Sequence, residues 1–134
     1  LYCPAGDFYI DPVRPVARAL ITHGHSDHAR AGHGAVMATR QTLAIMAIRY
    51  GVDFAESMQA ALPGETRRVG DVDVSFHPAG HVLGSAQIAV TKGASRAVVS
   101  GDYKRAGAAI CSARGRRSVC LSSAPRRRGT RWRG

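Results

Sequence analysis

The sequence predicts an α+β fold in which one sheet packs against another and helical segments lie outside. Short apolar runs recur between turns that contain Gly or Pro, which is typical of strands. One segment has the periodicity of an amphipathic helix, and no internal repeat is visible. Strands dominate and do not alternate with helices. The order of elements therefore disfavours a parallel βαβ series.

Three strands and one helix are predicted in the first part of the chain. The strands cover residues 8–10, 17–22 and 35–38. The first strand ends at Asp11-Pro12, because proline cannot donate to a ladder. Thr39 suits the N-cap of a helix over residues 41–50, and Gly51 suits the position behind its end. One face of this helix would hold Leu43, Met46, Ala47 and Tyr50.

The sequence in the middle of the chain predicts further strands after a turn. Pro63-Gly64 is a turn signal. The strands that we expect after it cover residues 65–69, 72–76, 85–91 and 96–100.

Composition indicates a single domain without a membrane span. The chain has 134 residues, of which 45% are hydrophobic. No apolar run approaches the roughly 18 residues that a spanning helix needs. The three cysteines are an odd count, which argues against a disulfide framework. We therefore expect a cytoplasmic location and no membrane association.

The charge is unevenly distributed along the chain. Residues 1–102 hold nine acidic and nine basic residues, whereas residues 103–134 hold ten basic residues and no acidic one. Large apolar side chains are scarce in the second part, so burial cannot offset its ordering entropy. We expect a folded domain over residues 1–105 and a disordered Arg-rich tail over residues 106–134. The tail is either a nucleic-acid-binding arm or, in the interpretation we favour, a product of out-of-frame translation.

One short run concentrates candidate metal ligands. Residues 23–28 read His-Gly-His-Ser-Asp-His, directly behind an apolar strand. Imidazole nitrogens and carboxylate oxygens are ligands that Zn²⁺ accepts. His23 and His25 are two residues apart, so an extended backbone points both to the same side. Asp27 and His28 can turn back toward an adjacent position. This density of ligand types predicts a metal site.

Two distant residues complete the predicted set. His81 lies in a loop flanked by Gly80 and Gly84, between two predicted strands. Asp102 directly follows an apolar strand. Either residue alone would be weak evidence. Because both follow a His-rich run in order, we expect both to be ligands.

This order of motifs resembles the metallo-β-lactamase superfamily. Residues 77–86 (HPAGHVLGSA) and 100–105 (SGDYKR) resemble the β-CASP nucleases, relatives of the RNA 3′-end processing endonucleases. Residues 2–12 (YCPAGDFYIDP) look most like the bacterial ligase-associated DNA exonucleases. The resemblance covers about Leu1 to Arg105. It implies the N-terminal half of an αββα four-layer sandwich.

The resemblance also implies a two-zinc site. Its ligands would be His23, His25 and His81 for the first zinc, Asp27 and His28 for the second, and Asp102 as a bridge between the two. Two metals about 3.5–4 Å apart can hold both the attacking and the leaving oxygen of a phosphodiester. Asp27 and Asp102 are the candidate catalytic residues. Asp11 would support the site without binding metal.

After Asp102, the sequence departs from the pattern of the family. Family members continue with a carboxylate motif, a β-CASP insert and late histidines that complete the second zinc site. No His follows His81 here, and no Asp or Glu follows Asp102. We therefore expect about one tightly held zinc and an inactive fragment of the nuclease lineage.

Several functions fit these patterns. We favour a metal-dependent phosphodiester hydrolase of the β-CASP nuclease type. It would come from a DNA exonuclease lineage of DNA repair, with DNA as partner and by resemblance a DNA ligase. The alternatives are an RNA-processing β-CASP nuclease, a small-molecule metallohydrolase of the thioesterase or lactamase kind, and a non-catalytic basic fragment. Tyr103-Lys104-Arg105 suits a phosphate backbone better than an acyl substrate. Binding to nucleic acid by charge alone would weaken steeply with salt.

Overall fold

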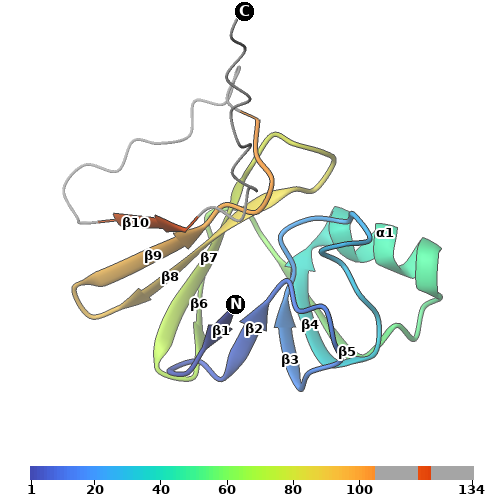
Figure 1. Ribbon diagram of the computed structural model, residues 1–134, viewed down its shortest axis with the longest axis horizontal. Helices are drawn as coiled ribbons and strands as arrows, with labels where there is room; N and C mark the ends of the chain where they lie inside the picture. Colours follow the sequence, from blue (N-terminus) through green and yellow to red (C-terminus); the bar gives the residue numbers. More distant parts are fainter. Residues whose placement is uncertain (105–117, 122–134) are drawn as a thin grey trace, which may run out of the picture.

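Two facing sheets and one helix make up the part of the chain that the structure describes. The computed structural model describes residues 1–104 and 118–121 (Figure 1). Sheet A has the order β1-β2-β3-β4-β5 and sheet B the order β10-β9-β8-β7-β6. The strands of sheet A are β1 (Tyr2–Cys3), β2 (Phe8–Ile10), β3 (Arg18–Leu20), β4 (His33–Thr39) and β5 (Ala55–Ala61). Those of sheet B are β6 (Thr66–Val69), β7 (Val72–Pro78), β8 (Ala86–Lys92), β9 (Ser95–Val99) and β10 (Ser118–Leu121).

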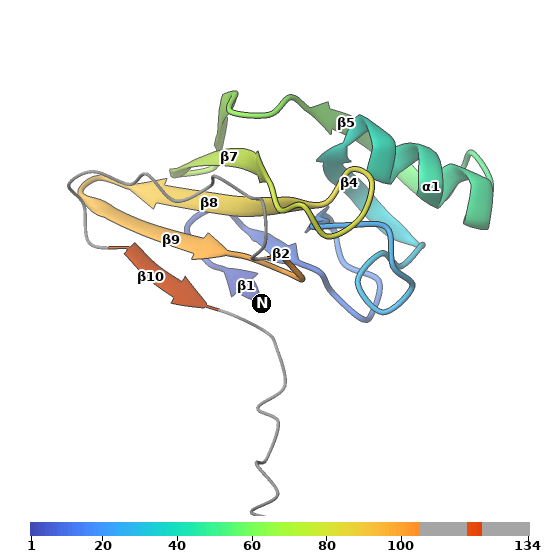
Figure 2. The same ribbon diagram turned by 90° about the horizontal axis from the view of Figure 1, so that it is seen from above.

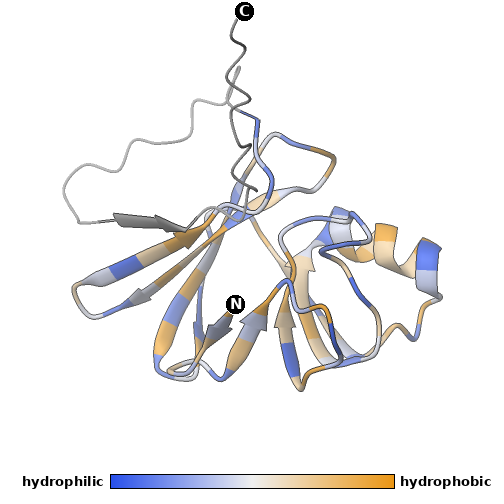
Figure 3. Cartoon of the chain, in the orientation of Figure 1, coloured by the Kyte–Doolittle hydropathy of each residue, from blue (hydrophilic) through white to orange (hydrophobic). Residues whose placement is uncertain are grey.

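The main core lies between the two sheets. Hydrophobic and hydrophilic residues alternate along several strands, so each strand has one apolar face (Figure 3). The buried side chains of this core are Phe8, Ile10, Leu20, Met37 and Ala61 from sheet A and Val72, Val74, Phe76, Ala86, Ile88 and Val99 from sheet B. Phe8 and Phe76 are the largest of them and are almost fully buried. This packing holds the ends of the two sheets beside each other.

A second core joins sheet A to the helix α1 (Arg40–Tyr50), which lies on the face of the sheet that points away from sheet B (Figure 2). Its members are Ala19, Ile21, Ala29, Val36, Ala38, Met46, Phe54 and Ala55. Leu43 and Ala47 pack against them, in agreement with the predicted helix face. Thr39 is the N-cap, as predicted, because its side chain accepts from the backbone N–H of Thr42. No helix in the described ranges is long and apolar enough to cross a membrane.

The sheet-on-sheet arrangement is confirmed, but the expected absence of parallel pairing is wrong for sheet A. Strands β2 to β5 are mutually parallel. The segment β4-α1-β5 is therefore a βαβ unit, in which the helix carries the chain back so that β5 runs parallel to β4. Strand β5 was missing from the prediction because Ala55–Ala61 (AESMQAA) lacks β-branched residues.

Four residues of the predicted tail lie within the described part of the chain. Ser118–Leu121 form β10, which pairs with β9 in parallel, from Ser118 opposite Arg96 to Leu121 opposite Val99. Strand β9 offers unpaired N–H and C=O groups at the edge of sheet B, which an extended segment can use whatever its side chains. The rest of the predicted tail, and the domain boundary at residue 105, lie outside the described residues.

Candidate metal centre

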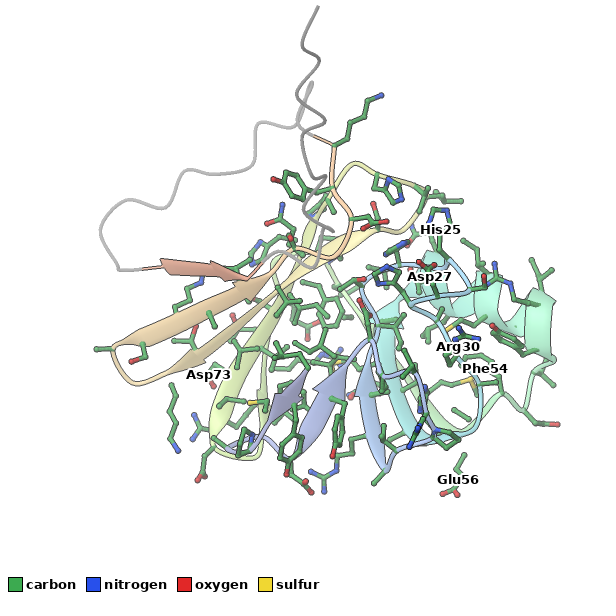
Figure 4. The ribbon with its side chains drawn as sticks, viewed as in Figure 1. His25, Asp27, Arg30, Phe54, Glu56 and Asp73 are labelled. Atoms are coloured by element: carbon green, nitrogen blue, oxygen red, sulfur yellow. The ribbon has the colours of Figure 1, made fainter. Side chains whose placement is uncertain are left out.

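The candidate ligands lie where strands of both sheets end. Strand β3 leads into the loop with His23, His25, Asp27 and His28, and His81 lies in the loop between β7 and β8. Asp102 lies three residues after the end of β9. Figure 4 labels His25 and Asp27 at this end of the molecule, and Figure 1 shows the three segments close together there. The fold thus brings to one place residues that are far apart in the sequence.

Four predicted ligands converge on one point. One ligand atom each of His23, His25, His81 and Asp102 lies within 4.8 Å of the others. His25 Nδ1 is 3.1 Å from His23 Nε2 and 3.3 Å from His81 Nε2. Asp102 Oδ2 is 3.5 Å from His81 Nε2 and 3.8 Å from His23 Nε2. The three histidines come from two loops, and the carboxylate comes from a third segment.

These separations are close to those between the ligand atoms of a zinc ion. Zinc binds His nitrogen and carboxylate oxygen at about 2.0–2.2 Å, so the corners of its tetrahedron lie roughly 3.3–3.6 Å apart. Four of the six separations between the ligand atoms run from 3.1 to 3.8 Å and bracket that value, and all six lie within 4.8 Å. Three imidazoles and one carboxylate are also a usual donor set for this ion. The residues present therefore fit a metal ion.

The hydrogen bonds of Thr22 with Asp11 and His23 determine which nitrogen of the His23 ring faces the candidate metal centre. The Thr22 hydroxyl donates to Asp11 Oδ2 at 2.6 Å, so its single proton is used. His23 Nδ1 lies 3.0 Å from the same hydroxyl oxygen and must donate to it. The proton of a neutral His23 is therefore on Nδ1, which leaves a lone pair on Nε2 for a metal. A carboxylate and a hydroxyl together orient this ligand.

The surroundings keep His23 neutral. The side chain is fully buried, and burial lowers the pKa of His23 to about 4, with the neighbouring His28 and His25 acting in the same direction. Asp11 and Asp102 offset only part of this effect. Because a metal binds the unprotonated imidazole, a low pKa keeps His23 ready to bind at neutral pH.

Asp27 and His28 lie beside the four-atom cluster as a separate pair. His28 Nε2 and Asp27 Oδ2 are 3.6 Å apart. His28 Nδ1 donates to Asp11 Oδ2 at 2.8 Å, and this hydrogen bond is the main cause that raises the pKa of His28. The ring of His28 lies 4.2 Å from that of His23. The predicted ligands of a second metal are thus adjacent to the first group, with Asp27 largely exposed.

Two residues of the site have no clear signal in the sequence. Thr22 donates its backbone N–H to Asp11 and accepts through its carbonyl from Ala86, which ties sheet A to sheet B. The hydroxyl of Ser85 accepts from the backbone N–H groups of His81 and Val82, which closes the loop that carries His81. Hydroxyl residues are common at loop ends, so only their position next to a predicted ligand could have suggested these roles.

Solved structures with the same arrangement identify the fold. A metallo-β-lactamase of Cronobacter sakazakii superposes with a TM-score of 0.58 at 19% identity, over 80% of this chain and 56% of that one. The chain contains part of a metallo-β-lactamase fold. A B3 metallo-β-lactamase with an active-site glutamic acid gives a TM-score of 0.51 at 21% identity, over 63% of this chain and 41% of that one. The flavodiiron protein of Giardia intestinalis gives a TM-score of 0.54 at 19% identity, over 63% of this chain and 22% of that one.

Sequence comparison adds a relative from DNA metabolism. A probable DNA ligase of Opitutus terrae is 35% identical over 107 residues, which are 78% of this chain. The chain spans about a tenth (10%) of that protein. No protein-family model matches the chain. The predicted metallo-β-lactamase fold is thus confirmed, whereas the β-CASP branch and the ligase-associated exonuclease subgroup stay predictions.

Proposed function

We propose that the chain is the metal-binding part of a metal-dependent phosphodiester hydrolase of the β-CASP nuclease type. The lineage is that of the DNA exonucleases that work with a DNA ligase in repair, and the resident ion is zinc. The observation that carries the proposal is the cluster of His23, His25, His81 and Asp102, whose ligand atoms lie within 4.8 Å of one another. The cytoplasmic setting is part of the proposal and rests on the cysteine count.

The residues of the chain have separate tasks in this proposal. His23, His25 and His81 would hold the ion, with Asp102 as the fourth ligand. A bound divalent ion activates water and neutralises charge on a phosphoryl group. Asp27 is exposed beside the cluster, and its carboxylate can accept a proton or orient a water molecule there. A hydrogen bond to its own backbone is the main cause that lowers the pKa of Asp27, so it is ionised at neutral pH.

Two observations favour nucleic acid over an acyl substrate. The relative from Opitutus terrae carries the name of a DNA ligase, and ligation needs ends that a nuclease can prepare. Tyr103 is exposed and Lys104 follows it, next to Asp102 at the edge of the centre. An aromatic ring and a cation beside a metal suit a base and a phosphate. RNA remains the near alternative, since the same contacts serve both nucleic acids.

The metal content of the purified chain tests the first part of the proposal. We expect about one zinc per folded chain by elemental analysis, because the described residues hold one complete four-ligand set. His25→Ala removes the nitrogen that faces both other imidazoles and should abolish zinc binding. Asp73→Asn, far from the centre in Figure 4, is the control and should retain it. Two zinc ions per wild-type chain would support a complete second site and overturn the stoichiometry.

Binding and turnover assays separate the substrate classes. Labelled DNA and RNA, a β-lactam and a thioester should be offered to the zinc-loaded chain and to His25→Ala. We expect zinc-dependent binding of nucleic acid that survives moderate salt, and no hydrolysis by the chain itself. Turnover of the β-lactam or the thioester would reject the nuclease assignment. Nucleic-acid binding that is equal in His25→Ala and vanishes with salt would indicate attraction by charge alone.

A further inference from the structure

Helix α1 contacts both loops that supply the histidine ligands. Its N-terminus faces the loop between β7 and β8, which carries His81. Its C-terminal turn faces the loop behind β3, which carries His23 and His25. These loops belong to different sheets, and His25 and His81 are 56 residues apart in the sequence. A helix of 11 residues is about 16 Å long and stiff, so it can set the distance between them.

Two hydroxyls at the start of the helix hold the His81 loop. Thr39 Oγ donates to the carbonyl oxygen of Gly84 at 2.7 Å, and Thr42 Oγ donates to the same oxygen at 3.1 Å. Thr42 is fully buried. Gly84 has a φ of +77°, and a Cβ at this position would lie 2.7 Å from Cβ of Gln41. The loop thus approaches the helix as closely as a backbone without a side chain can.

Packing alone does not hold this loop. A cavity of about 250 Å³ lies beside it, lined in part by Gly80, Val82 and Gly84. The hydrogen bonds to Ser85 Oγ close the loop on itself and do not connect it to sheet A. Beside the bond from Ala86 N–H to the Thr22 carbonyl at the end of the loop, the two threonine hydroxyls are therefore the contacts that fix the position of His81 relative to the other ligands.

The last turn of the helix holds the other loop. Arg49 Nη1 donates to the carbonyl oxygen of Gly24 at 2.7 Å. Tyr50 donates its hydroxyl to the carbonyl oxygen of Ala29 at 2.9 Å. A Cβ on Gly24 would lie 2.9 Å from Cγ2 of Ile45, so here too the loop backbone lies directly against the helix. Gly24 precedes His25 and Ala29 follows His28, so the helix holds this segment on both sides of its histidines.

We propose that α1 positions the metal centre, with Thr42 and Arg49 as the positioning residues at its two ends. By holding Gly84 and Gly24 at a set separation, the helix keeps His81 Nε2 near the 3.3 Å from His25 Nδ1 that a shared metal requires. Metal affinity then depends on side chains that touch neither the ion nor its ligands. The inference rests on the proposed metal site and goes beyond it, since it assigns the affinity to the helix.

Variants of Thr42 test the N-terminal contact. Thr42→Val keeps the shape and removes the hydroxyl, whereas Thr42→Ser keeps the hydroxyl. Zinc affinity should be measured by competition with a chromophoric chelator, beside the unfolding of the metal-free protein. Removing a direct hydrogen-bond partner of a metal ligand weakens binding by about 10–100-fold, and Thr42 acts one step further out through Gly84, so we expect Thr42→Val to lose affinity by up to about tenfold. Thr42→Ser should stay close to wild type, because it keeps the hydroxyl that bonds to Gly84.

Variants of Arg49 test the other end at an exposed position where folding is not at risk. Arg49→Met should weaken zinc binding and change the visible spectrum of bound Co²⁺, which reports the geometry of the ligands. Arg40→Met, on the same helix, is the matched control, because no hydrogen bond or ion pair of Arg40 occurs among the described residues. In the double variant with Thr42→Val, the two losses should be less than additive, since either one already frees the loops from each other.

The outcomes are distinguishable. If wild type binds no zinc, the proposed metal site fails and the inference fails with it. If wild type binds zinc, and Thr42→Val and Arg49→Met lose stability of the metal-free protein but keep wild-type zinc affinity and Co²⁺ spectrum, the metal site stands. The role of the helix is then structural only, and the inference is overturned. If Thr42→Val does not fold, Arg49→Met against Arg40→Met decides alone.

Discussion

At the scale of single residues, Asp11 orients two candidate ligands at once. Its carboxylate accepts from Thr22 N–H at 2.8 Å, from the Thr22 hydroxyl at 2.6 Å and from His28 Nδ1 at 2.8 Å. The hydroxyl in turn sets the tautomer of His23. Asp11 has a φ of +46°, a region that Asp tolerates better than most residues. The expectation that Asp11 supports the site without joining the ligands agrees with this geometry.

Asp11→Asn should weaken metal binding. An amide has one acceptor oxygen and a donor NH₂, so it cannot accept all three hydrogen bonds: if its oxygen keeps those from the Thr22 hydroxyl and His28, its NH₂ group faces the Thr22 N–H. We expect zinc affinity to fall by about 10–100-fold, measured by chelator competition. The pKa of His28 should also fall toward its ordinary value, which NMR titration of the metal-free protein can follow. Asp7→Asn is the matched control, because Asp7 also has a positive φ (50°) but bonds only to the exposed Tyr2; equal losses in both variants would contradict the prediction.

At the scale of elements, the conformation of the segment that follows β9 depends on one glycine. Gly101 has a φ of +55°, and a Cβ there would lie 2.6 Å from Thr22 Oγ and 2.8 Å from Thr22 Cβ. Thr22 follows β3 of sheet A, and Gly101 follows β9 of sheet B. This close crossing of the Gly101 backbone over the Thr22 side chain places Asp102 beside His23.

Gly101→Ala should affect both stability and metal binding. A left-handed conformation alone costs about 1–2 kcal/mol for a residue with a side chain. Gly93→Ala has the same backbone demand, with a φ of +56° and no atom within 4 Å of the added Cβ, and it should show only that cost. Gly101→Ala should be destabilised further and should lose zinc affinity, because the clash displaces Asp102. Chemical denaturation and zinc titration of both variants measure the difference, and equal behaviour would refute the role of the crossing.

At the scale of the whole molecule, the stability of the metal-free protein depends on histidines that are buried without charge. His33 begins β4 at the end opposite to the metal centre and is 1% exposed. Its Nδ1 accepts from the backbone N–H of Val16. Burial lowers the pKa of His33, and an interaction with the backbone of Arg30 offsets only part of this. His23 is lowered in the same way, to about 4.

Acid should therefore remove the contribution of His23 and His33 to the stability of the metal-free protein, while His28, whose pKa is raised, contributes in the opposite sense. When the folded state has the lower pKa, the unfolded state binds protons first, so the free energy of unfolding falls as the pH drops below about 6.5 and continues to fall through the folded pKa. Denaturation in chelator between pH 7.5 and 4.5 should show this decline. His33→Gln keeps an acceptor but does not titrate, so its decline should be smaller than that of wild type. Parallel curves for the two proteins would exclude a contribution from His33.

Local sequence was sufficient for the elements whose cause is local. The helix could be predicted with its N-cap at Thr39 because capping and periodicity act within a few residues. Most strands of sheet B alternate along short runs between Gly turns, and their predicted ranges agree with the structure within a few residues. Strand β5 could not be predicted, because pairing with β4 overrides the weak strand preference of its residues.

The sequence by itself determined which residues are able to bind a metal, since six residues with the run His-x-His-x-Asp-His carry that chemistry in any fold. Only the tertiary structure decided which of them meet: His23, His25, His81 and Asp102 form one cluster, and Asp27 and His28 lie beside it. The same holds for Thr22, Thr42 and Arg49, whose contacts join segments from different sheets or from opposite ends of one helix. Such contacts depend on how the sheets and the helix pack, and no local pattern records that packing.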